Sequence, residues 1–307
     1  MSLKITYKKG VNEKNIKNFV LFSNEEFKIN GINKLPVAKN SNQINKTINS
    51  YKSKKKDFIS FNINSDQKVI LIKIKQNKNA TENEKKGANF YNFAKSNLLT
   101  DLNFLEKNIV ETQKHNPSFI DEFLHGMQIK SYEFNKYKTK NETHQMGINV
   151  VFKTKIPLKN KNNRFNSLLE GTNFTKDLVS EPGNILHPDE YAKRILKLKK
   201  IGLKIKILND KKLKKLGMGA LLGVGQGSVR GSYLVTMEWN GDRSNSKPLA
   251  FVGKGVCFDT GGYSLKPARF MEDMTYDMAG SAAVVGLLKT LALRKAKVNA
   301  VGVVGLV

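Results

Sequence analysis

The residues that could do chemistry lie together in one stretch, 252–280, which reads VGKGVCFDTGGYSLKPARFMEDMTYDMAG. Its carboxylates Asp259 and Asp277 are hard oxygen ligands of the kind that divalent metals prefer. Lys254 has a glycine on each side, and burial beside cations would lower the pKa of such a lysine, because desolvation and like charge disfavour the ammonium. A neutral amine can ligate a metal, whereas Lys266 is better placed as a charged group that polarises a carbonyl oxygen.

The elements around this stretch must bring these side chains to one place. An apolar run, 248–252, predicts a buried strand, and a helix rich in small residues is predicted over 279–293. A second apolar run, 298–307, has the pattern of a buried parallel strand that is covered on both faces. Because ligands of open α/β sheets bind beyond the carboxyl ends of strands, polar residues there indicate a site. The alternative is a solvated loop in which Lys and Asp pair on the surface, which is a common and weak arrangement.

The full string is more specific than any single motif within it. It resembles the hallmark of the cytosol (leucyl) aminopeptidase family, which runs V-G-K-G-x-x-F-D-[ST]-G-G-x-S-L-K-P and then M-x-x-D-M-x-G-[AS]-A-A. The matching residues are 253–255, 258–262, 264–267 and 274–283. The resemblance extends more loosely into the amino-terminal half of the chain.

This resemblance implies a metal-dependent aminopeptidase that hydrolyses amino-terminal residues from peptides with two divalent ions, Mn²⁺ or Zn²⁺, per subunit. It implies that Lys254, Asp259 and Asp277 are metal ligands. It also implies that Lys266 is the catalytic lysine, which helps to stabilise the oxyanion. Met274 would line the pocket for the first side chain of the substrate. A homo-hexamer with its catalytic domains facing inward is implied as well.

The chain departs from the family in one respect. The second hallmark of the family, N-T-D-A-E-G-R, supplies two more carboxylates and an arginine, and no such string occurs in the 307 residues. Two-metal hydrolysis needs ions about 3.5–4 Å apart, and three ligands do not hold both ions and orient a water. We therefore expect a truncated chain that does not fully ligate the metals and is inactive by itself. We also expect 298–307 to form an exposed, aggregation-prone sheet edge.

A chain of 307 residues is long enough for two domains. We predict an α/β fold that begins with a small amino-terminal α/β domain, 1–158, followed by a bridging helix and linker, 159–186. The remainder, 187–307, is predicted to be the first half of an α/β catalytic domain with a mostly parallel central sheet, incomplete at its carboxyl end.

The coarse pattern along the chain supports this division. Apolar runs predict strands at 19–22, 58–61, 69–72, 148–152, 204–208 and 233–237, and helical patterns cover 80–99, 119–132 and 165–178. Thr81 is the predicted N-cap of the helix 80–99. The polar segment 28–56 predicts a mobile loop, and 223–228 predicts a glycine-rich turn rather than a phosphate-binding nest.

The charge of the chain raises a second functional hypothesis, a basic nucleic-acid-binding protein that uses its lysine-rich amino-terminal domain. The formal net charge is +27, and residues 249–307 contribute only +3 of it. Residues 1–150 contain no arginine, however. Arginine is the residue that usually donates paired hydrogen bonds to phosphates and to the edges of guanine bases. We therefore favour a general compositional drift towards lysine over a nucleic-acid partner.

The remaining composition predicts a soluble, intracellular protein. Cys257 is the single cysteine, so no internal disulfide forms, and its apolar neighbours predict a buried, inert thiol. No amino-terminal signal pattern and no apolar run near 18 residues is evident, so no membrane is expected. We predict a cytoplasmic protein.

Overall fold

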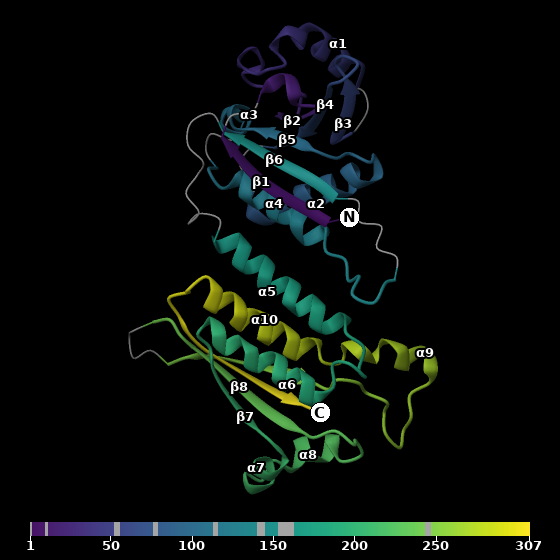
Figure 1. Ribbon diagram of the computed structural model, residues 1–307, viewed down its shortest axis with the longest axis vertical. Coiled ribbons are helices and arrows are strands. Elements are labelled where there is room, and N and C mark those ends of the chain that lie inside the picture. The colour runs from purple at the N-terminus through teal and green to yellow at the C-terminus, as the bar shows by residue number, and fades with distance from the viewer. Residues whose placement is uncertain are drawn as a thin grey trace. The chain divides into compact units, whose positions relative to one another are not determined.

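The chain forms two compact units in the computed structural model, Met1–Asn162 and Asn163–Val307 (Figure 1). The structure describes residues 2–9, 12–51, 56–75, 79–112, 116–139, 145–152, 163–242 and 247–307. The predicted domain boundary at 158/159 lies outside these residues. The helix α5 (Asn163–Ser180), which was predicted as part of a bridge, belongs to the second unit.

A six-stranded sheet of order β1-β6-β5-β2-β4-β3 is the frame of the first unit. All of its pairings are parallel except that of β3 with β4. Its strands are β1 (Ser2–Lys9), β2 (Asn18–Ser23), β3 (Phe58–Asn62), β4 (Lys68–Lys73), β5 (Leu102–Leu105) and β6 (Gln145–Phe152). The central strands β2 and β4 are nearly continuous apolar runs, as expected of strands that are covered on both faces.

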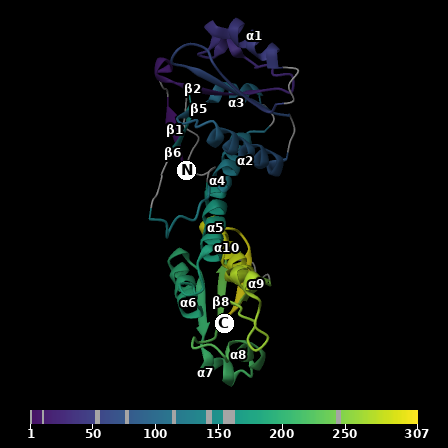
Figure 2. The ribbon, with the colours of Figure 1, turned by 90° about the vertical axis from the view of Figure 1, so that its right-hand side faces the viewer.

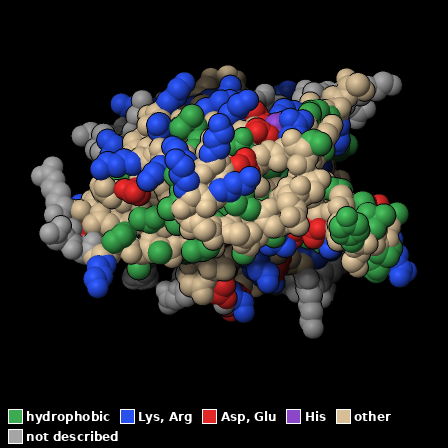
Figure 3. All heavy atoms as spheres, turned by 90° about the horizontal axis from the view of Figure 1, so that it is seen from below, with side chains coloured by type: hydrophobic (Ala, Val, Ile, Leu, Met, Phe, Trp, Pro, Cys, Tyr) green, Lys and Arg blue, Asp and Glu red, His purple; other side chains and the backbone are tan. Residues whose placement is uncertain are grey.

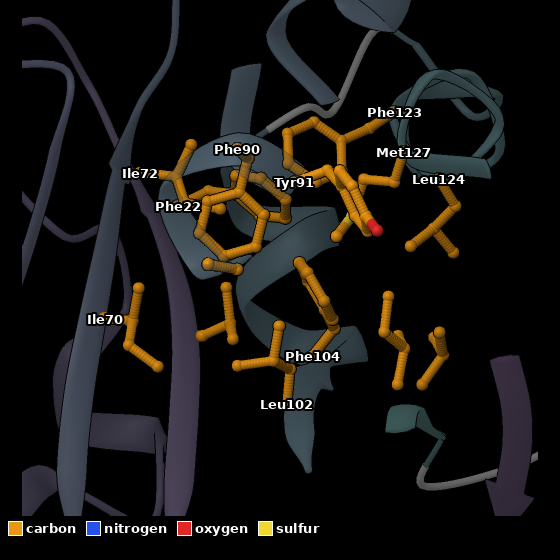
Figure 4. Close-up of a cluster of buried hydrophobic side chains, with 14 of the residues drawn as sticks. Phe22, Ile70, Ile72, Phe90, Tyr91, Leu102, Phe104, Phe123, Leu124 and Met127 are labelled. Atoms are coloured by element: carbon orange, nitrogen blue, oxygen red, sulfur yellow. The ribbon is translucent and has the colours of Figure 1, made fainter. Parts of the chain in front are cut away.

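Hydrophobic cores lie on both faces of this sheet. The helices of the unit are η1 (Glu13–Asn15), η2 (Ile32–Lys34), η3 (Ala38–Asn40), α1 (Ser41–Tyr51), α2 (Ala80–Ser96), α3 (Glu106–Thr112) and α4 (Phe119–Lys130). On the α2 and α4 side, Phe22, Phe90 and Phe123 cluster together (Figure 4). The two helices touch backbone to backbone, since a Cβ atom at Gly87 would lie 1.9 Å from the Phe123 carbonyl oxygen.

Two local predictions for this unit are wrong. The segment 28–56 holds the helix α1, because Ile44 and Ile48 recur one helical turn apart and are both buried in the core. The N-cap of α2 is Asn79 rather than Thr81. The Asn79 side chain accepts the Glu82 N–H, and the Glu82 carboxylate accepts the Asn79 N–H, which is a complete capping box.

A mixed sheet of order β7-β8-β10-β9 is the frame of the second unit. Its strands are β7 (Lys204–Leu208), β8 (Tyr233–Asn240), β9 (Leu249–Gly255) and β10 (Asn299–Leu306). The two strands on which the site prediction rests, β9 and β10, pair in parallel, whereas β8 pairs antiparallel with both β7 and β10. With helices packed on these sheets, the fold class is α/β, as predicted.

The expectation that 298–307 forms an exposed edge is wrong. β10 lies inside the sheet because β8, which precedes it in the chain, pairs with its other side. Its residues alternate between buried and half-buried. Among the described residues, the edge strands of this sheet are β7 and β9, and on β9 Leu249 and Val252 are strongly exposed.

Helices α5 and α10 (Ala279–Leu293) run alongside each other in this unit (Figures 1 and 2). Gly171 and Gly286 allow this approach, because a Cβ atom at either one would lie about 2 Å from a threonine hydroxyl of the other helix. The other helices are α6 (Pro188–Leu196), η4 (Lys197–Ile201), α7 (Asp210–Lys215), α8 (Gly219–Gly225), α9 (Ala268–Met271) and η5 (Glu272–Tyr276). Helix α8 occupies the start of the predicted turn 223–228, which is therefore only partly a turn.

One stretch in the described residues, Ala268–Leu293, is long and apolar enough to pass a length-and-composition test for a membrane-crossing helix. The sequence analysis did not identify it. Half of its most apolar window is buried within the protein, and α10, which forms most of it, packs against α5, β9 and β10. These contacts are those of a core helix.

Candidate metal centre and active site

Lys254 and Asp277 form the first of two ion pairs in the candidate site. Lys254 lies near the carboxyl end of β9, and Asp277 lies just before α10. Gly253 lets the strand approach this helix, because a Cβ atom there would lie 2.6 Å from the Ser281 Cα atom. The Lys254 Nζ atom is consequently 2.7 Å from Asp277 Oδ1.

Asp259 and Lys266 form the second pair, with 3.1 Å between Lys266 Nζ and Asp259 Oδ2. The loop between them turns back on itself, since Gly261 adopts φ +88°, a conformation that favours glycine. The Gly261 N–H donates to Asp259 Oδ1 at 2.8 Å, and the Lys266 N–H donates to the Thr260 carbonyl at 2.9 Å. Sequence spacing alone does not show this reversal, which places the lysine against the carboxylate.

The electrostatics of the second pair keep Asp259 ionised. The Gly261 N–H lowers the pKa of the Asp259 carboxyl most strongly, and the hydrogen bond from Lys266 adds to the effect. The positive charges of Lys266 and Lys254 lower this pKa further, so both lysines act on the same carboxylate. The charge of Lys254, which belongs to the first ion pair, thus also favours the ionised form of Asp259 in the second.

The side chains present offer donors that suit a divalent cation. The Asp277 Oδ2 atom is buried and has no hydrogen-bond partner, although a buried carboxylate oxygen ordinarily has one. Asp259 adds a second carboxylate, and Lys254 adds an amine whose side chain is 60% exposed rather than buried. Among the described residues, no three His, Cys, Asp or Glu side chains form a closed metal site. These donors are of types that suit a divalent metal, but they do not form a complete coordination shell.

Met274 is the remaining predicted site residue. It lies half-buried in η5, and its carbonyl accepts the N–H of Asp277 at 3.3 Å. The structure thus ties Met274 to a candidate ligand. Its contact with a substrate side chain stays a prediction.

A pocket of about 350 Å³ lies beside Asp259, and sequence reasoning missed it. Its polar lining includes His187, Ser228 and Arg230, which come from separate parts of the second unit. Sequence patterns do not reveal this position of His187, because a residue before a proline carries no signal of what faces it across the fold. Met274 does not line this pocket.

A network of side-chain hydrogen bonds holds the wall of this pocket. Asp189 Oδ1 accepts the Tyr233 hydroxyl at 2.6 Å, and Asp189 Oδ2 lies 3.1 Å from His187 Nδ1. The hydrogen bond to Asp189 raises the pKa of Tyr233 to about 12. Cys257, which also lines the pocket, is buried, and this burial raises its pKa to about 12. The prediction of a buried thiol is confirmed, and its inertness stays a prediction.

Comparison with known proteins identifies the part of the chain that holds these residues. Residues 173–307 match the catalytic domain of the cytosol aminopeptidase family. The chain resembles the cytosol aminopeptidases. Lys254, Asp259, Lys266 and Asp277 all lie within the matched residues, and the resemblance predicted from the hallmark string is confirmed.

Curated relatives support the same family. A probable cytosol aminopeptidase of Brucella anthropi is 51% identical over 189 residues, which are 59% of this chain and 38% of the relative. One from Phytoplasma australiense is 49% identical over 187 residues, which are 60% of this chain and 38% of the relative. The matched part of the chain thus spans about two fifths of the length of these cytosol aminopeptidases.

Solved structures that are 19% identical in sequence to this chain share its fold. A cytosol aminopeptidase from Coxiella burnetii has a TM-score of 0.72, with 99% of this chain and 60% of that chain covered. A tomato leucine aminopeptidase mutant has a TM-score of 0.73, with coverage of 99% and 62%. The bottromycin maturation enzyme BotP, solved in complex with Mn, has a TM-score of 0.71, with coverage of 95% and 59%.

Proposed function

We propose that this chain is part of a metal-dependent aminopeptidase that removes amino-terminal residues from peptides. The observation that carries the proposal is the pairing of Lys254 with Asp277 and of Lys266 with Asp259 at the carboxyl end of β9. These four chemically suited side chains lie in a segment that matches an aminopeptidase catalytic domain. The predicted nucleic-acid alternative has no comparable support, and the similar proteins named above are aminopeptidases or a maturation enzyme.

Lys254, Asp259 and Asp277 would hold the metal. The buried, unpartnered Asp277 Oδ2 atom supports this role, because a cation would satisfy it. A bound divalent ion supplies Lewis-acid polarisation of a carbonyl and lowers the pKa of water. We propose two ions, Mn²⁺ or Zn²⁺, in the whole protein. Three donors do not surround two ions, so we propose that this chain by itself lacks peptidase turnover.

The other two residues act on the substrate in this proposal. The Lys266 side chain is 30% exposed, so a substrate can approach it, and its charge stabilises the oxyanion that develops on the scissile carbonyl. Asp259 holds this ammonium in place at 3.1 Å. Met274 offers a flexible apolar surface to the first side chain of the peptide.

The remaining parts of the proposal concern the whole protein. The relatives are named as cytosol aminopeptidases, which supports a cytoplasmic location and peptide substrates. We propose a homo-hexamer on the family resemblance. Exposed apolar side chains in the segment after β9 suit a contact with another subunit: Tyr263, Leu265, Phe270 and Tyr276. Figure 3 shows hydrophobic side chains gathered at its right-hand end, the side on which Figure 1 places α9.

The metal content of the purified chain tests the proposed ligands. After gel filtration with Mn²⁺, the unaltered chain should retain metal and Asp259→Ala should lose it, since a carboxylate donor is gone. Lys289→Gln is a control outside the site, because Lys289 lies towards the far end of α10, where it forms an ion pair with Glu170 of α5. Equal Mn²⁺ retention by Asp259→Ala and the unaltered chain would exclude Asp259 as a ligand.

A chimera tests the reaction itself. Residues 173–307 would replace the aligned segment of the Brucella anthropi relative, and hydrolysis of leucine amide would be measured with Mn²⁺. We expect the chimera to be active, and its Lys266→Ala variant to lose about 10²–10³-fold in kcat with its metal retained. A folded, Mn²⁺-loaded chimera without turnover would refute the proposed function of this segment.

A further inference from the structure

A second pocket, of about 300 Å³, lies in the first unit and belongs to no part of the proposed peptidase site. It opens at the carboxyl end of the parallel strand β4, where Lys73 and the residues after it form one wall. The first half of α2 forms another wall, and Asp57, just before β3, closes the third. The carboxyl ends of parallel strands are the place where ligands of open α/β sheets bind, and β4 pairs in parallel with β2.

The lining of this pocket is basic. Lys73, Lys75, Lys85 and Lys86 line it against two carboxylates, those of Asp57 and Glu82. Glu82 already serves the capping box of α2, and Lys75 pairs with Glu25, which does not line the pocket. Lys85 is exposed, and no ion pair is recorded for it among the described residues. The lining therefore carries more positive charge than its own carboxylates offset.

Two of these lysines are fixed in position. The Nζ atoms of Lys86 and Lys73 lie 2.9 Å and 3.6 Å from the two oxygens of Asp57. Each ammonium also lies over a ring, Lys86 over Phe58 at 5.5 Å and Lys73 over Phe27 at 5.3 Å. About three quarters of each lysine side chain is covered. One carboxylate thus holds two ammonium groups next to each other. Lysines that only keep a surface solvated would not need this arrangement.

We infer that this pocket binds a small molecule that carries phosphate groups. Two preorganised ammoniums with two more lysines at the rim suit a compact ligand with at least two negative charges. The pocket is concave and near the lower limit of ordinary small-molecule sites, which suits such a ligand better than a nucleic-acid strand. Residues 1–150 also lack the arginines that nucleic-acid readers use.

Titration calorimetry with inorganic pyrophosphate, phosphate and acetate at low ionic strength tests this inference. Pyrophosphate should bind more tightly than phosphate, and acetate should not bind, because the ligand charge decreases in that order. The double variant Lys73→Gln/Lys86→Gln should weaken pyrophosphate binding by about tenfold or more. Lys85→Gln, an exposed change that leaves the core intact, should weaken it severalfold.

A control of equal charge separates the pocket from the general basicity of the chain. Lys34→Gln/Lys95→Gln removes two lysines of the same unit that pair with Glu111 and Glu133, outside the pocket. This control should bind pyrophosphate like the unaltered chain. Equal weakening in the control and pocket variants would overturn the inference, as would no pyrophosphate binding at millimolar concentration. Retention of a single-stranded oligonucleotide that is lost only in the pocket variants, without pyrophosphate binding, would overturn it too.

Discussion

Lys254 and Asp277 meet through one carboxylate oxygen only. The Lys254 Nζ atom lies 2.7 Å from Asp277 Oδ1, whereas Asp277 Oδ2 is buried and has no hydrogen-bond partner. An ion pair that served stability alone would leave a buried acceptor unsatisfied, at a cost of about 1–3 kcal/mol. This asymmetry supports the proposal that Asp277 is a metal ligand.

The two lysines of the site should respond differently to the same change. Lys254→Arg should weaken Mn²⁺ binding at least about tenfold, because a guanidinium stays protonated and has no lone pair to donate. Lys266→Arg should keep the metal, since this lysine contributes charge rather than a ligand atom. Metal content after dialysis distinguishes the two variants, and equal loss in both would contradict the assigned roles.

The contact between α2 and α4 should be intolerant of a single methyl group. Gly126→Ala would place its Cβ atom 1.9 Å from the Glu84 carbonyl oxygen, which is backbone and has no rotamer to escape into. We expect a loss of about 1–3 kcal/mol in the free energy of unfolding, measured by urea denaturation. Gly147→Ala on β6 is the matched control, because its nearest neighbour atom would lie at 3.9 Å. A near-neutral Gly126→Ala would show that the helices are not in this contact.

The outer edge of β9, which is an edge strand among the described residues, should govern association of the chain. Val252 on this edge is 80% exposed, and an apolar strand edge is a template for pairing with another chain. Val252→Lys should therefore reduce concentration-dependent association, measured by light scattering. Val229→Lys makes the same chemical change at a fully exposed position outside the strands, and should have little effect. An equal improvement in both variants would assign the effect to net charge rather than to the edge.

Glu133 should make the stability of the chain sensitive to acid. The pKa of Glu133 is lowered from 4.5 to about 2, most strongly by the hydrogen bond from Lys95, with 2.7 Å between Nζ and Oε1, and further by other hydrogen bonds, including one from Asn135. A carboxyl with a depressed folded-state pKa stabilises the fold above its unfolded-state pKa, and this contribution is lost as pH falls from about 4.5 to 2. Because the pair is partly exposed, we expect at most about 1 kcal/mol.

Urea denaturation at several pH values measures this contribution. Glu133→Gln should unfold more easily than the unaltered chain at pH 7, and the difference should vanish near pH 2. A constant difference across this range would show that the ion pair with Lys95 is not its source.

The local sequence was enough to predict most strands, the helices α2, α4, α5 and α10, and all the proposed site residues. The strands β2 and β4 follow from continuous apolar runs and β7 from an alternating pattern, and both kinds of pattern depend only on neighbours in the chain. The donors of the candidate site lie in one stretch of 29 residues, 252–280, so their chemistry was readable from residue types and order.

Tertiary structure decided everything that depends on distant partners. β10 is apolar whether it lies at an edge or inside a sheet, and only its pairing with β8 places it inside. Part of the predicted loop 28–56 forms the helix α1, because the sheet offers a face on which Ile44 and Ile48 are buried. Lys73 and Asp57 are 16 residues apart and Lys86 is further on, so the basic pocket exists only once β3, β4 and α2 are packed. The sequence neighbours of a side chain do not predict such partners, because burial of the core brings these distant residues together.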